Sequence, residues 1–274
     1  MAVSPAKGEK VARVGEEHKP SISIVIPAYN EVGRIERALE SLLSYLGDRN
    51  DVEIIVVMDG CTDGSPKIVA RYAKRDARIV PLIFSRRLGK GGALLKGFEA
   101  ARGDVLVTCD ADMPTKPEEL FRLASMVDGY DLIIGSRYVK GAKLVRKPGP
   151  IRLFLSRAFN VFVRLLFKDL RHLRDTQCGI KVIKKELTKT VKRGLIITGL
   201  AFDVNLLYLA IKMGARIKEI GVWWNHREYK SKVSMEIMKV IPRMALALLK
   251  LKIRIRRLPL HVLRQRQGFS NALL

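Results

Sequence analysis

The sequence predicts an α/β fold: a Rossmann-like, mostly parallel sheet with flanking helices, followed by amphipathic helices toward the C-terminal end. Short β-branched runs alternate with amphipathic segments through the first half of the chain, as in repeated strand–helix units. The 274 residues are 48% hydrophobic, which suffices for one large domain with a substantial core. Residues 151–274 carry 27 Lys and Arg against 7 Asp and Glu. We therefore expect the second half to meet an anionic partner.

Strands and helices alternate regularly in the first half. The predicted strands cover residues 22–26, 52–58, 79–84 and 104–109, the first stopping at Pro27, and the predicted helices cover 32–46, 66–75 and 92–101. Such an order implies right-handed crossovers between parallel strands. Ligands of these sheets bind at the carboxyl ends of the strands, so we expect the chemistry there.

The segment 151–168 predicts a helix with an unusually wide apolar face. Its narrow polar stripe consists of Arg152, Ser156, Asn160 and Arg164. A membrane-spanning helix needs about 20 mostly apolar residues, and this one is interrupted by arginines. We expect it to lie in a membrane interface, with an ordinary core helix as the alternative.

Three regions follow from these patterns: a tail at 1–20, an α/β domain at 21–235 that includes the interfacial helix, and a basic amphipathic tail at 236–274. The first region lacks the apolar core of a signal peptide. In the last, aliphatic residues alternate with Lys and Arg, which favours attachment to an anionic membrane over a merely solvated tail. We expect a peripheral or monotopic protein at the cytoplasmic face of a membrane.

Composition also narrows the partners and the compartment. The formal net charge of +24 permits nucleic-acid binding, but aromatic residues total only 7% and the basic clusters mix with Leu and Ile. Single-stranded nucleic acids need aromatic stacking platforms, so we expect no nucleic-acid partner. Cys61, Cys109 and Cys178 lack metal-ligand spacing, which predicts no zinc site or disulfide framework and suits a reducing compartment.

An acidic pair ends the strand that we expect to be central. Asp110 and Asp112 stand two residues apart, so their side chains can point to one side and share a hard cation, or divide metal and ribose between them. Mg²⁺ prefers few protein carboxylates together with substrate phosphate oxygens. Carboxylate pairs are also common in loops, which is the alternative.

Two further polar segments follow strands. Asp59 begins DGCTDGS, where its carboxylate can accept a hydrogen bond from a base edge, although turn chemistry alone explains Asp and Gly there. Residues 86–93, RRLGKGGA, open a helix with glycines and cations, which suits a diphosphate at a helix N-terminus. The segment is neither a Walker A loop nor a GxGxxG turn after the first strand, so those nucleotide-binding classes are disfavoured.

Taken together and in order, PAYNE, VMDGCTDGS, RRLGKGGA, CDADMP and GSR resemble the inverting family-2 glycosyltransferases with the GT-A fold. Further along, DTQCG at 175–179, AFDV at 201–204 and the segment 223–232 are most similar to dolichyl-phosphate β-glucosyltransferases, with dolichol-phosphate mannosyltransferases as near relatives. The resemblance covers roughly residues 21–235.

The resemblance implies roles for particular residues. The nucleotide-sugar site would contain Pro27, Tyr29, Glu31, Val57, Asp59, Lys90, Asp110 and Ala111, with Lys90 near the diphosphate. The acceptor phosphate would be bound by Arg137, Arg157, Asp175, Gln177, Ser231 and Lys232. Asp112 would be the principal ligand of Mg²⁺ or Mn²⁺, with Asp110 beside it. Asp203 is assigned a supporting catalytic role, alongside Asp112 and Arg137. The alternatives are a helix N-terminal cap for Asp203 and a surface ion pair for Arg137.

Two positions depart from the family pattern where specificity is set. Mannosyltransferase relatives often have a metal-binding Gln where this chain has Pro114, so the metal must take water or a donor oxygen instead. An Arg upstream of the Ser231–Lys232 pair is replaced by His226.

These features predict an inverting glycosyltransferase that moves a sugar, glucose from UDP-glucose, onto a polyprenyl or dolichyl phosphate and leaves a β linkage. The acceptor needs no dedicated base, because a phosphomonoester is already a dianion at pH 7. GDP-mannose and UDP-N-acetylglucosamine remain alternative donors. A family-2 enzyme acting on a soluble or polysaccharide acceptor is the alternative reaction.

Overall fold

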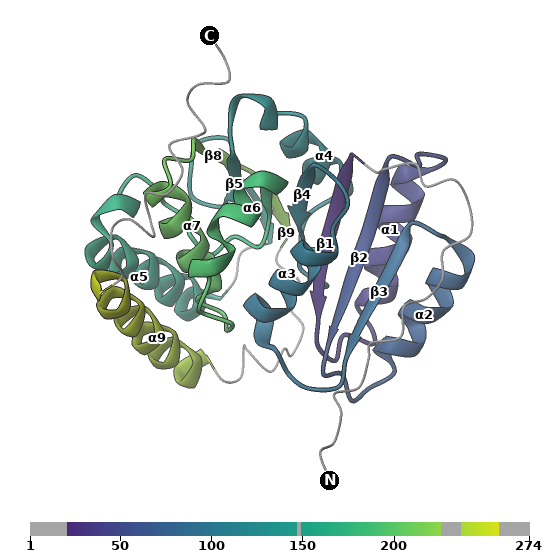
Figure 1. Ribbon diagram of the computed structural model, residues 1–274, viewed down its shortest axis with the longest axis horizontal. Helices are drawn as coiled ribbons and strands as arrows, with labels where there is room; N and C mark the ends of the chain where they lie inside the picture. Colours follow the sequence, from purple (N-terminus) through teal and green to yellow (C-terminus); the bar gives the residue numbers. More distant parts are fainter. Residues whose placement is uncertain (1–20, 147–148, 226–236, 258–274) are drawn as a thin grey trace.

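The computed structural model describes residues 21–146, 149–225 and 237–257. A seven-stranded sheet runs through its centre in the order β3-β2-β1-β4-β7-β5-β8 (Figure 1). The strands are β1 (Ile22–Ala28), β2 (Val52–Asp59), β3 (Ile79–Phe84), β4 (Val105–Thr108), β5 (Leu132–Ser136), β7 (Lys181–Lys184) and β8 (Ile217–Gly221). Only β7 runs antiparallel to its sheet neighbours, β4 and β5. The mostly parallel sheet is therefore confirmed, and β4 lies at its centre as predicted.

Helices cover both faces of the sheet. The α-helices are α1 (Ile35–Leu46), α2 (Ser65–Arg75), α3 (Gly89–Ala100), α4 (Pro117–Ala124), α5 (Pro150–Leu166), α6 (Lys185–Val191), α7 (Phe202–Lys212) and α9 (Ile237–Arg257), with short 3₁₀ turns η1 (Val127–Gly129), η2 (Lys168–Leu170) and η3 (Lys192–Gly194). Buried residues of α1, α2 and α4 share one apolar cluster, and those of α3, α5, α6, α7 and α9 share the other. Because both faces are covered, the central strands are largely apolar, with Ser23, Glu53, Thr108 and Lys181 as buried polar exceptions.

The first strand continues two residues beyond its predicted end. Pro27 lies inside β1, in register with Val57 of β2. The pairing of β1 with β4 ends at Val25, whose carbonyl accepts from the Cys109 amide. The nitrogen of Pro27 faces this same side, beyond the last pair of the ladder, so its missing N–H costs no sheet hydrogen bond.

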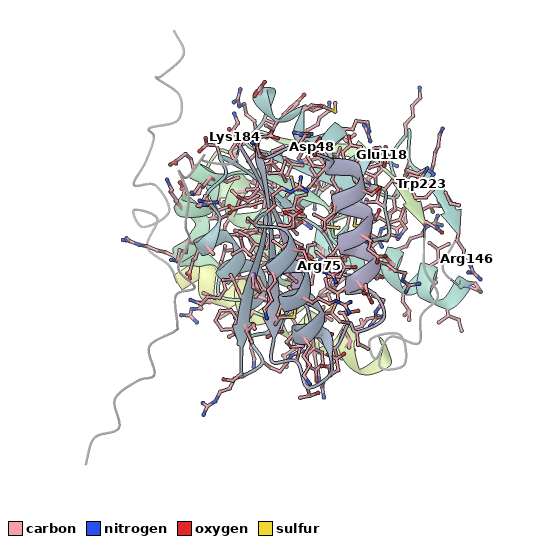
Figure 2. The ribbon with its side chains drawn as sticks, turned by 90° about the vertical axis from the view of Figure 1, so that its right-hand side faces the viewer. Asp48, Arg75, Glu118, Arg146, Lys184 and Trp223 are labelled. Atoms are coloured by element: carbon pink, nitrogen blue, oxygen red, sulfur yellow. The ribbon has the colours of Figure 1, made fainter. Side chains whose placement is uncertain are left out.

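A small second sheet lies beside the main one. It pairs β6 (Lys143–Arg146) with β9 (Trp223–Asn225) in parallel, and Figure 2 shows Arg146 and Trp223 on the same side of the molecule. The amide of Asn225 donates to the Pro114 carbonyl at 2.7 Å. This contact brings the β9 segment against the loop that follows β4.

The helices α5 and α9 lie side by side at the edge of the molecule farthest from β3 (Figure 1). Val163 of α5 and Leu248 of α9 are completely buried, so each helix packs one face on the core. On the outer face of α5, Phe154 and Leu165 are each 70% exposed. Part of the predicted C-terminal tail is therefore a helix packed on the domain, and the predicted domain boundary at 235 stays a prediction.

No helix within the described ranges is long and apolar enough to cross a membrane.

Candidate active site

Acidic side chains converge at the carboxyl ends of three adjacent parallel strands. Glu31 follows β1, Asp59 ends β2, and Asp110 and Asp112 follow β4. Adjacent parallel strands end at the same edge of a sheet, and the order β2-β1-β4 places these residues side by side. The acidic residues singled out from the sequence therefore lie together at this edge of the sheet, and their roles stay predictions.

The two β4 aspartates are brought together by a turn, not by strand alternation. The strand ends at Thr108, and the Met113 amide donates to the Asp110 carbonyl at 3.0 Å. Met113 has a φ of 46°, a left-handed conformation that is costly for a side chain with a Cβ. The buried Met113 side chain, 3% exposed, holds this turn in place. Both aspartates thus lie on the turn beyond β4 rather than within the strand.

Two lysines compensate the acidic cluster. Lys90 Nζ lies 2.7 Å from Asp110 Oδ1. Lys181 of β7 is only 1% exposed, and its ammonium bonds both Asp203 Oδ1 at 2.7 Å and the Cys178 carbonyl at 2.6 Å. Burial would raise the pKa of Asp110, but Lys90, with Lys181 and Arg137, outweighs it and holds this pKa below its usual value. Asp110 is therefore ionised at neutral pH.

Asp112 is less well compensated than Asp110. Burial and the neighbouring Asp110 charge raise its pKa to about 6. Burial likewise raises the pKa of Glu31 to about 7, against the opposing charge of Arg34, with Asp112 adding to the rise. At pH 7 the cluster therefore holds more negative charge than its surroundings favour.

This excess of negative charge fits a divalent cation. Within the parts of the chain that the structure describes, no three His, Cys, Asp or Glu side chains form a ready metal cage. A site of one or two carboxylates completed by substrate phosphate oxygens is how Mg²⁺ is usually held. Asp112, with Asp110 beside it, could provide such a partial site, which stays a prediction.

Most amides at the N-terminus of α3 are bound within the protein, so few of them face the diphosphate expected there from the sequence, and that expectation stays a prediction. The amides of Leu88 and Gly89 donate to the two carboxylate oxygens of Asp59, and those of Gly91 and Gly92 donate to the Thr198 carbonyl at 2.8 and 3.1 Å. The glycines serve close packing instead. A Cβ at Gly89 would lie 2.5 Å from the Thr198 oxygen, and one at Gly91 2.5 Å from the Phe202 Cβ.

The Asp59 carboxylate also has several interaction partners within the protein. Besides the two amides, its carboxylate lies 3.4 Å from Arg87 Nε, and the Arg87 guanidinium stacks 3.4 Å above the Tyr29 ring. Asp59 thus ties the loop that follows β3 to the end of β2. Oδ2 faces both the Gly89 amide and Arg87, whereas Oδ1 accepts from the Leu88 amide. The predicted contact of Asp59 with a base stays a prediction.

Arg137 and Asp175 form a buried clamp next to the acidic cluster. Arg137 donates through Nε and one terminal nitrogen to the two oxygens of Asp175 at 2.7 and 2.8 Å, and its backbone amide also donates to that carboxylate. Asp175 is completely buried, so its part in the predicted phosphate site would be indirect and stays a prediction. It orients Arg137, whose guanidinium keeps unused donors. The ion pair weighed as an alternative for Arg137 exists, but it is buried rather than on the surface.

A groove of about 590 Å³ opens beside this clamp. Arg137, Arg157, Arg164 and Arg174 line it. Of these four, only Arg137 has a carboxylate partner among the described residues. Three guanidiniums without an acid partner, facing a polar groove, make a strong site for a phosphate-bearing ligand.

The other predicted residues divide into three groups. Pro27, Tyr29, Ala111 and Gln177 lie at or next to the strand ends of the site. Val57 is completely buried in the core, so its side chain does not line the site and a direct contact through it does not fit. Ser231 and Lys232, like His226, lie outside the described residues.

Asp203 lies in the first turn of α7 but does not cap the helix, since Ala201 occupies the N-cap position and no side chain bonds there. Its carboxylate faces Lys181 instead.

A family model for glycosyl transferase family 2 matches residues 23–191, a stretch that contains the acidic cluster, Lys90 and the Arg137–Asp175 clamp. The chain belongs to glycosyl transferase family 2. The resemblance drawn from the short motifs is therefore confirmed, and the chain is a glycosyltransferase.

Curated relatives of this family-2 glycosyltransferase include two dolichyl-phosphate beta-glucosyltransferases. That of Dictyostelium discoideum is 29% identical over 84% of this chain and 77% of its own length, and that of Drosophila melanogaster is 33% identical over 76% and 68%. Glycosyltransferase AglD of Haloferax volcanii is 38% identical over 74% of this chain, but the match spans only 33% of that protein.

Solved structures agree on the fold. Glucosyl-3-phosphoglycerate synthase from Mycobacterium tuberculosis, crystallised with Mn²⁺, UDP-glucose and glycerol 3-phosphate, superposes with a TM-score of 0.64. The two chains are 20% identical, and the match covers 85% of this chain and 80% of the other. The likeness establishes the GT-A fold of this glycosyltransferase.

Several residues near the glycosyltransferase site were not predicted from the sequence. Lys181 begins β7, whose other lysine, Lys184, is less buried, and a lysine between Ile180 and Val182 in an apolar run was the available signal. Gly179 was quoted only as part of a motif, yet a Cβ there would meet the Asp110 carboxylate at 2.0 Å. Arg34, which pairs with Glu31, gave no signal, because an arginine at the start of a helix is common.

Proposed function

We propose that this glycosyltransferase moves glucose from UDP-glucose onto the phosphate of a polyprenyl or dolichyl-type lipid, with inversion at the anomeric carbon. The proposal rests mainly on two neighbouring groups of charged side chains, one acidic and one basic. An acidic cluster with Lys90 lies at the end of β4, and an arginine-lined groove opens beside it. Arg137 is close enough to Asp110 to lower its pKa. The names of the curated relatives support this substrate pair.

The acidic cluster would hold the donor. Asp112, with Asp110, would bind a divalent cation that neutralises the donor diphosphate and the departing UDP. Lys90, already paired with Asp110, would place a second positive charge near the same phosphates. The Mn²⁺ and UDP-glucose crystallised with the related fold support this arrangement.

The groove would hold the acceptor phosphate. Arg137 would bind it through the donors that Asp175 leaves free, and Arg157 would approach from α5. Bidentate guanidinium contacts suit phosphate oxygens better than point charges do. Gln177, whose backbone amide donates to Asp175 at 3.4 Å, would shape the same wall.

The reaction needs no strong base. At pH 7 the acceptor is largely a dianion, and one of its oxygens attacks the anomeric carbon as the bond to the UDP oxygen breaks. No proton is transferred in that step. The protein must align two phosphate-bearing substrates and offset their repulsion. Asp203 would act only by positioning, since its carboxylate fixes Lys181, which in turn favours the ionised form of Asp110.

The outer faces of α5 and α9 would rest on the membrane that contains the acceptor. Ile151, Phe154 and Leu165 on α5 are each at least 70% exposed, and Leu246, Leu249 and Ile253 on α9 between 44% and 56%. Each set recurs at helical spacing and forms one stripe. Location at the cytoplasmic face of that membrane remains our prediction.

The proposal is tested by offering the purified protein three donors with short-chain polyprenyl phosphate. UDP-glucose, GDP-mannose and UDP-N-acetylglucosamine are supplied separately with Mg²⁺ or Mn²⁺, and lipid-linked sugar is followed by mass spectrometry. We expect product from UDP-glucose. If only GDP-mannose or UDP-N-acetylglucosamine gives product, the sugar named in the proposal is wrong. Transfer only to soluble glycans would contradict the lipid acceptor.

A further inference from the structure

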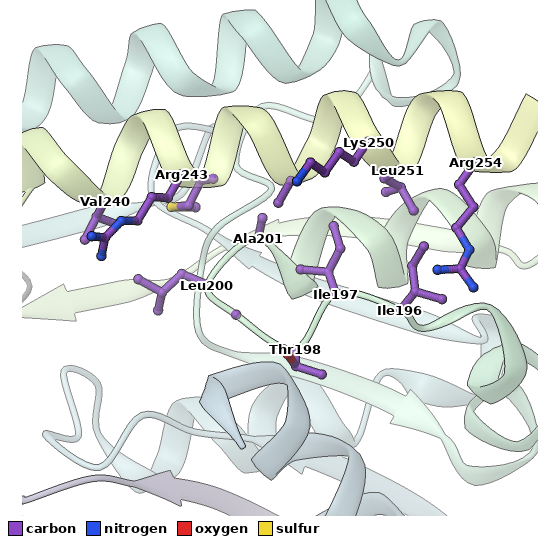
Figure 3. A pocket seen from close by; sticks show the side chains of 13 residues that line it. Ile196, Ile197, Thr198, Leu200, Ala201, Val240, Arg243, Lys250, Leu251 and Arg254 are labelled. Atoms are coloured by element: carbon purple, nitrogen blue, oxygen red, sulfur yellow. The ribbon is translucent and has the colours of Figure 1, made fainter. Parts of the chain in front are cut away.

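A second groove lies between α9 and the segment from Ile196 to Ala201, and the proposed reaction does not use it. Its volume is about 540 Å³, within the range of roughly 300–1,000 Å³ that is common for ligand pockets. Ile196, Ile197 and Leu200 line it from one side and Leu251 of α9 from the other (Figure 3). Met244 and Ala247 of α9 are also lining residues. Its lining is predominantly apolar.

Cations line this apolar groove along one helix. Arg243, Lys250 and Arg254 project from α9 at its border (Figure 3). All three are exposed, and none has a carboxylate partner in the part of the chain that the structure describes. Their spacing of seven and four residues places them in one stripe.

The position of this basic stripe on α9 is informative. At about 100° per residue, the stripe falls between the exposed apolar stripe of Leu246, Leu249 and Ile253 and the side chains that line the groove. A molecule lying against the outer face of α9 therefore meets the cations first and the groove behind them. An anionic head group attached to a hydrocarbon chain has this same order of charge and apolar surface.

The acceptor is not the best occupant of this groove. The acceptor has one phosphate, and the proposed function places that phosphate in the arginine-lined groove beside Arg137, called here the Arg137 groove. The groove between α9 and residues 196–201, called here the α9 groove, shares no lining residue with it. A second, separate set of three cations implies a second anion.

We propose that the α9 groove binds one acyl chain of an anionic bilayer phospholipid, with the phosphate of its head group held by Arg243, Lys250 and Arg254. The site goes beyond the proposed sugar transfer and depends on no donor.

Hydrogen bonds also connect the α9 groove to the start of α3, which carries Lys90. Thr198, between the apolar residues Ile197 and Leu200, accepts hydrogen bonds from Gly91 and Gly92, directly after Lys90. A lipid chain packed on this segment would support the same loop that holds the start of α3.

Photolabelling of the full-length protein tests this site. Phosphatidylglycerol with a photoreactive diazirine near the end of one acyl chain is added to phosphatidylcholine liposomes without any donor, and labelled residues are mapped by mass spectrometry. Labelled phosphatidylcholine serves as the head-group control. We expect phosphatidylglycerol to label the segment 196–201 and the groove side of α9, at Met244, Ala247 or Leu251.

Two variants separate this site from general membrane contact. Replacing Arg243, Lys250 and Arg254 by Gln should lower groove labelling by phosphatidylglycerol at least about tenfold. Replacing three exposed cations of α2 by Gln (Lys67, Lys74 and Arg75) removes the same charge elsewhere and should not. Ala247→Phe should block groove labelling but leave labels at Leu246, Leu249 and Ile253.

Several results overturn the proposal. These are equal labelling by the two head groups, labels confined to the outer stripe, or displacement of the label by polyprenyl phosphate, which would make the groove part of the acceptor site. The Gln variants alter only exposed side chains, so they remain informative if Ala247→Phe fails to fold.

Discussion

At the scale of single residues, the negative charge of Asp112 is offset by nearby cations less fully than that of Asp110, the other aspartate that follows β4. A divalent cation bound there would offset the repulsion from Asp110. We expect Asp112→Asn to lower transfer by at least about 100-fold, since metal stabilisation of departing phosphates contributes several kcal/mol. Mg²⁺ with UDP should raise the melting temperature of the wild-type protein but not that of the variant. An equal metal-dependent rise in both proteins would contradict the metal role of Asp112.

Glu31 gives a pH-dependent prediction for the protein without ligands. Its pKa of about 7 in the folded state lies above that of an unfolded glutamate, about 4.3. Its favourable contribution is therefore complete below pH 4 and is lost as pH rises through 7. Relative to the wild type, Glu31→Gln should gain stability between pH 5 and pH 8, on the order of 3 kcal/mol. Chemical denaturation at the two pH values measures this, and a constant difference contradicts it.

Asp175 should act on the acceptor through Arg137. Asp175→Asn removes one charge of a buried pair, which costs about 3–5 kcal/mol of stability when the partner stays charged. Among molecules that remain folded, we expect the KM for polyprenyl phosphate to rise at least about tenfold while the KM for UDP-glucose stays nearly constant. A purely structural role would instead lower the amount of active enzyme and leave both KM values unchanged.

At the scale of elements, the glycines of α3 are required by close packing rather than by a ligand. A Cβ at Gly91 would lie 2.5 to 2.6 Å from three Phe202 atoms, whereas one at Gly33 meets nothing within 4 Å. We expect Gly91→Ala to lower the free energy of unfolding by about 1–3 kcal/mol, and Gly33→Ala to change it by less than about 0.5 kcal/mol. Equal effects would show that the α3 contact with α7 is loose.

These elements also show what a sequence can and cannot predict. The strand 79–84 matches β3 because a β-branched run flanked by polar residues has few alternatives. The order of sheet strands and the antiparallel β7 were not predicted, since Lys181–Lys184 is short and begins with a buried lysine. The helix after RRLGKGGA was predicted over 92–101 but begins at Gly89, and the partner of its first turn, the Thr198 carbonyl, lies more than a hundred residues away and leaves no local signal.

Individual residues of the candidate site could be identified from the sequence, but the contacts between them could not. Asp110, Asp112, Lys90 and Arg137 were identified from motifs. Their pairing with Asp175 and with each other depends on tertiary contacts between separate strands, which spacing in the sequence does not encode. Val57 was placed in the site from the resemblance alone, and only the structure shows that its side chain is buried.

At the scale of the whole molecule, charge and exposed apolar surface gather at the edge formed by α5 and α9. Replacing Phe154 and Leu165 by Ser should weaken binding to anionic liposomes at least about tenfold, because each large apolar side chain contributes about 1.5–3 kcal/mol when buried. Ile83→Ser is a matched control, since Ile83 is 61% exposed on β3, at the far edge of the sheet. Flotation assays measure both, and equal losses would contradict a specific membrane-facing edge.

The same arrangement would let one chain serve the soluble donor and the lipid acceptor of the proposed reaction. The donor cluster lies at the carboxyl ends of β1, β2 and β4, within the domain. The Arg137 groove is lined in part by α5, the helix that also exposes Phe154. The acceptor phosphate would therefore reach the donor from the membrane side.

The most direct test of the central claim is the linkage of the product formed from UDP-glucose and polyprenyl phosphate. Phosphorus NMR should show the acceptor monoester replaced by a phosphodiester, and the proton coupling at the anomeric carbon should show the β configuration. That result would establish the acceptor phosphate as the nucleophile, with inversion. An α-linked product, or glucose attached elsewhere while the phosphomonoester remains, would contradict the account.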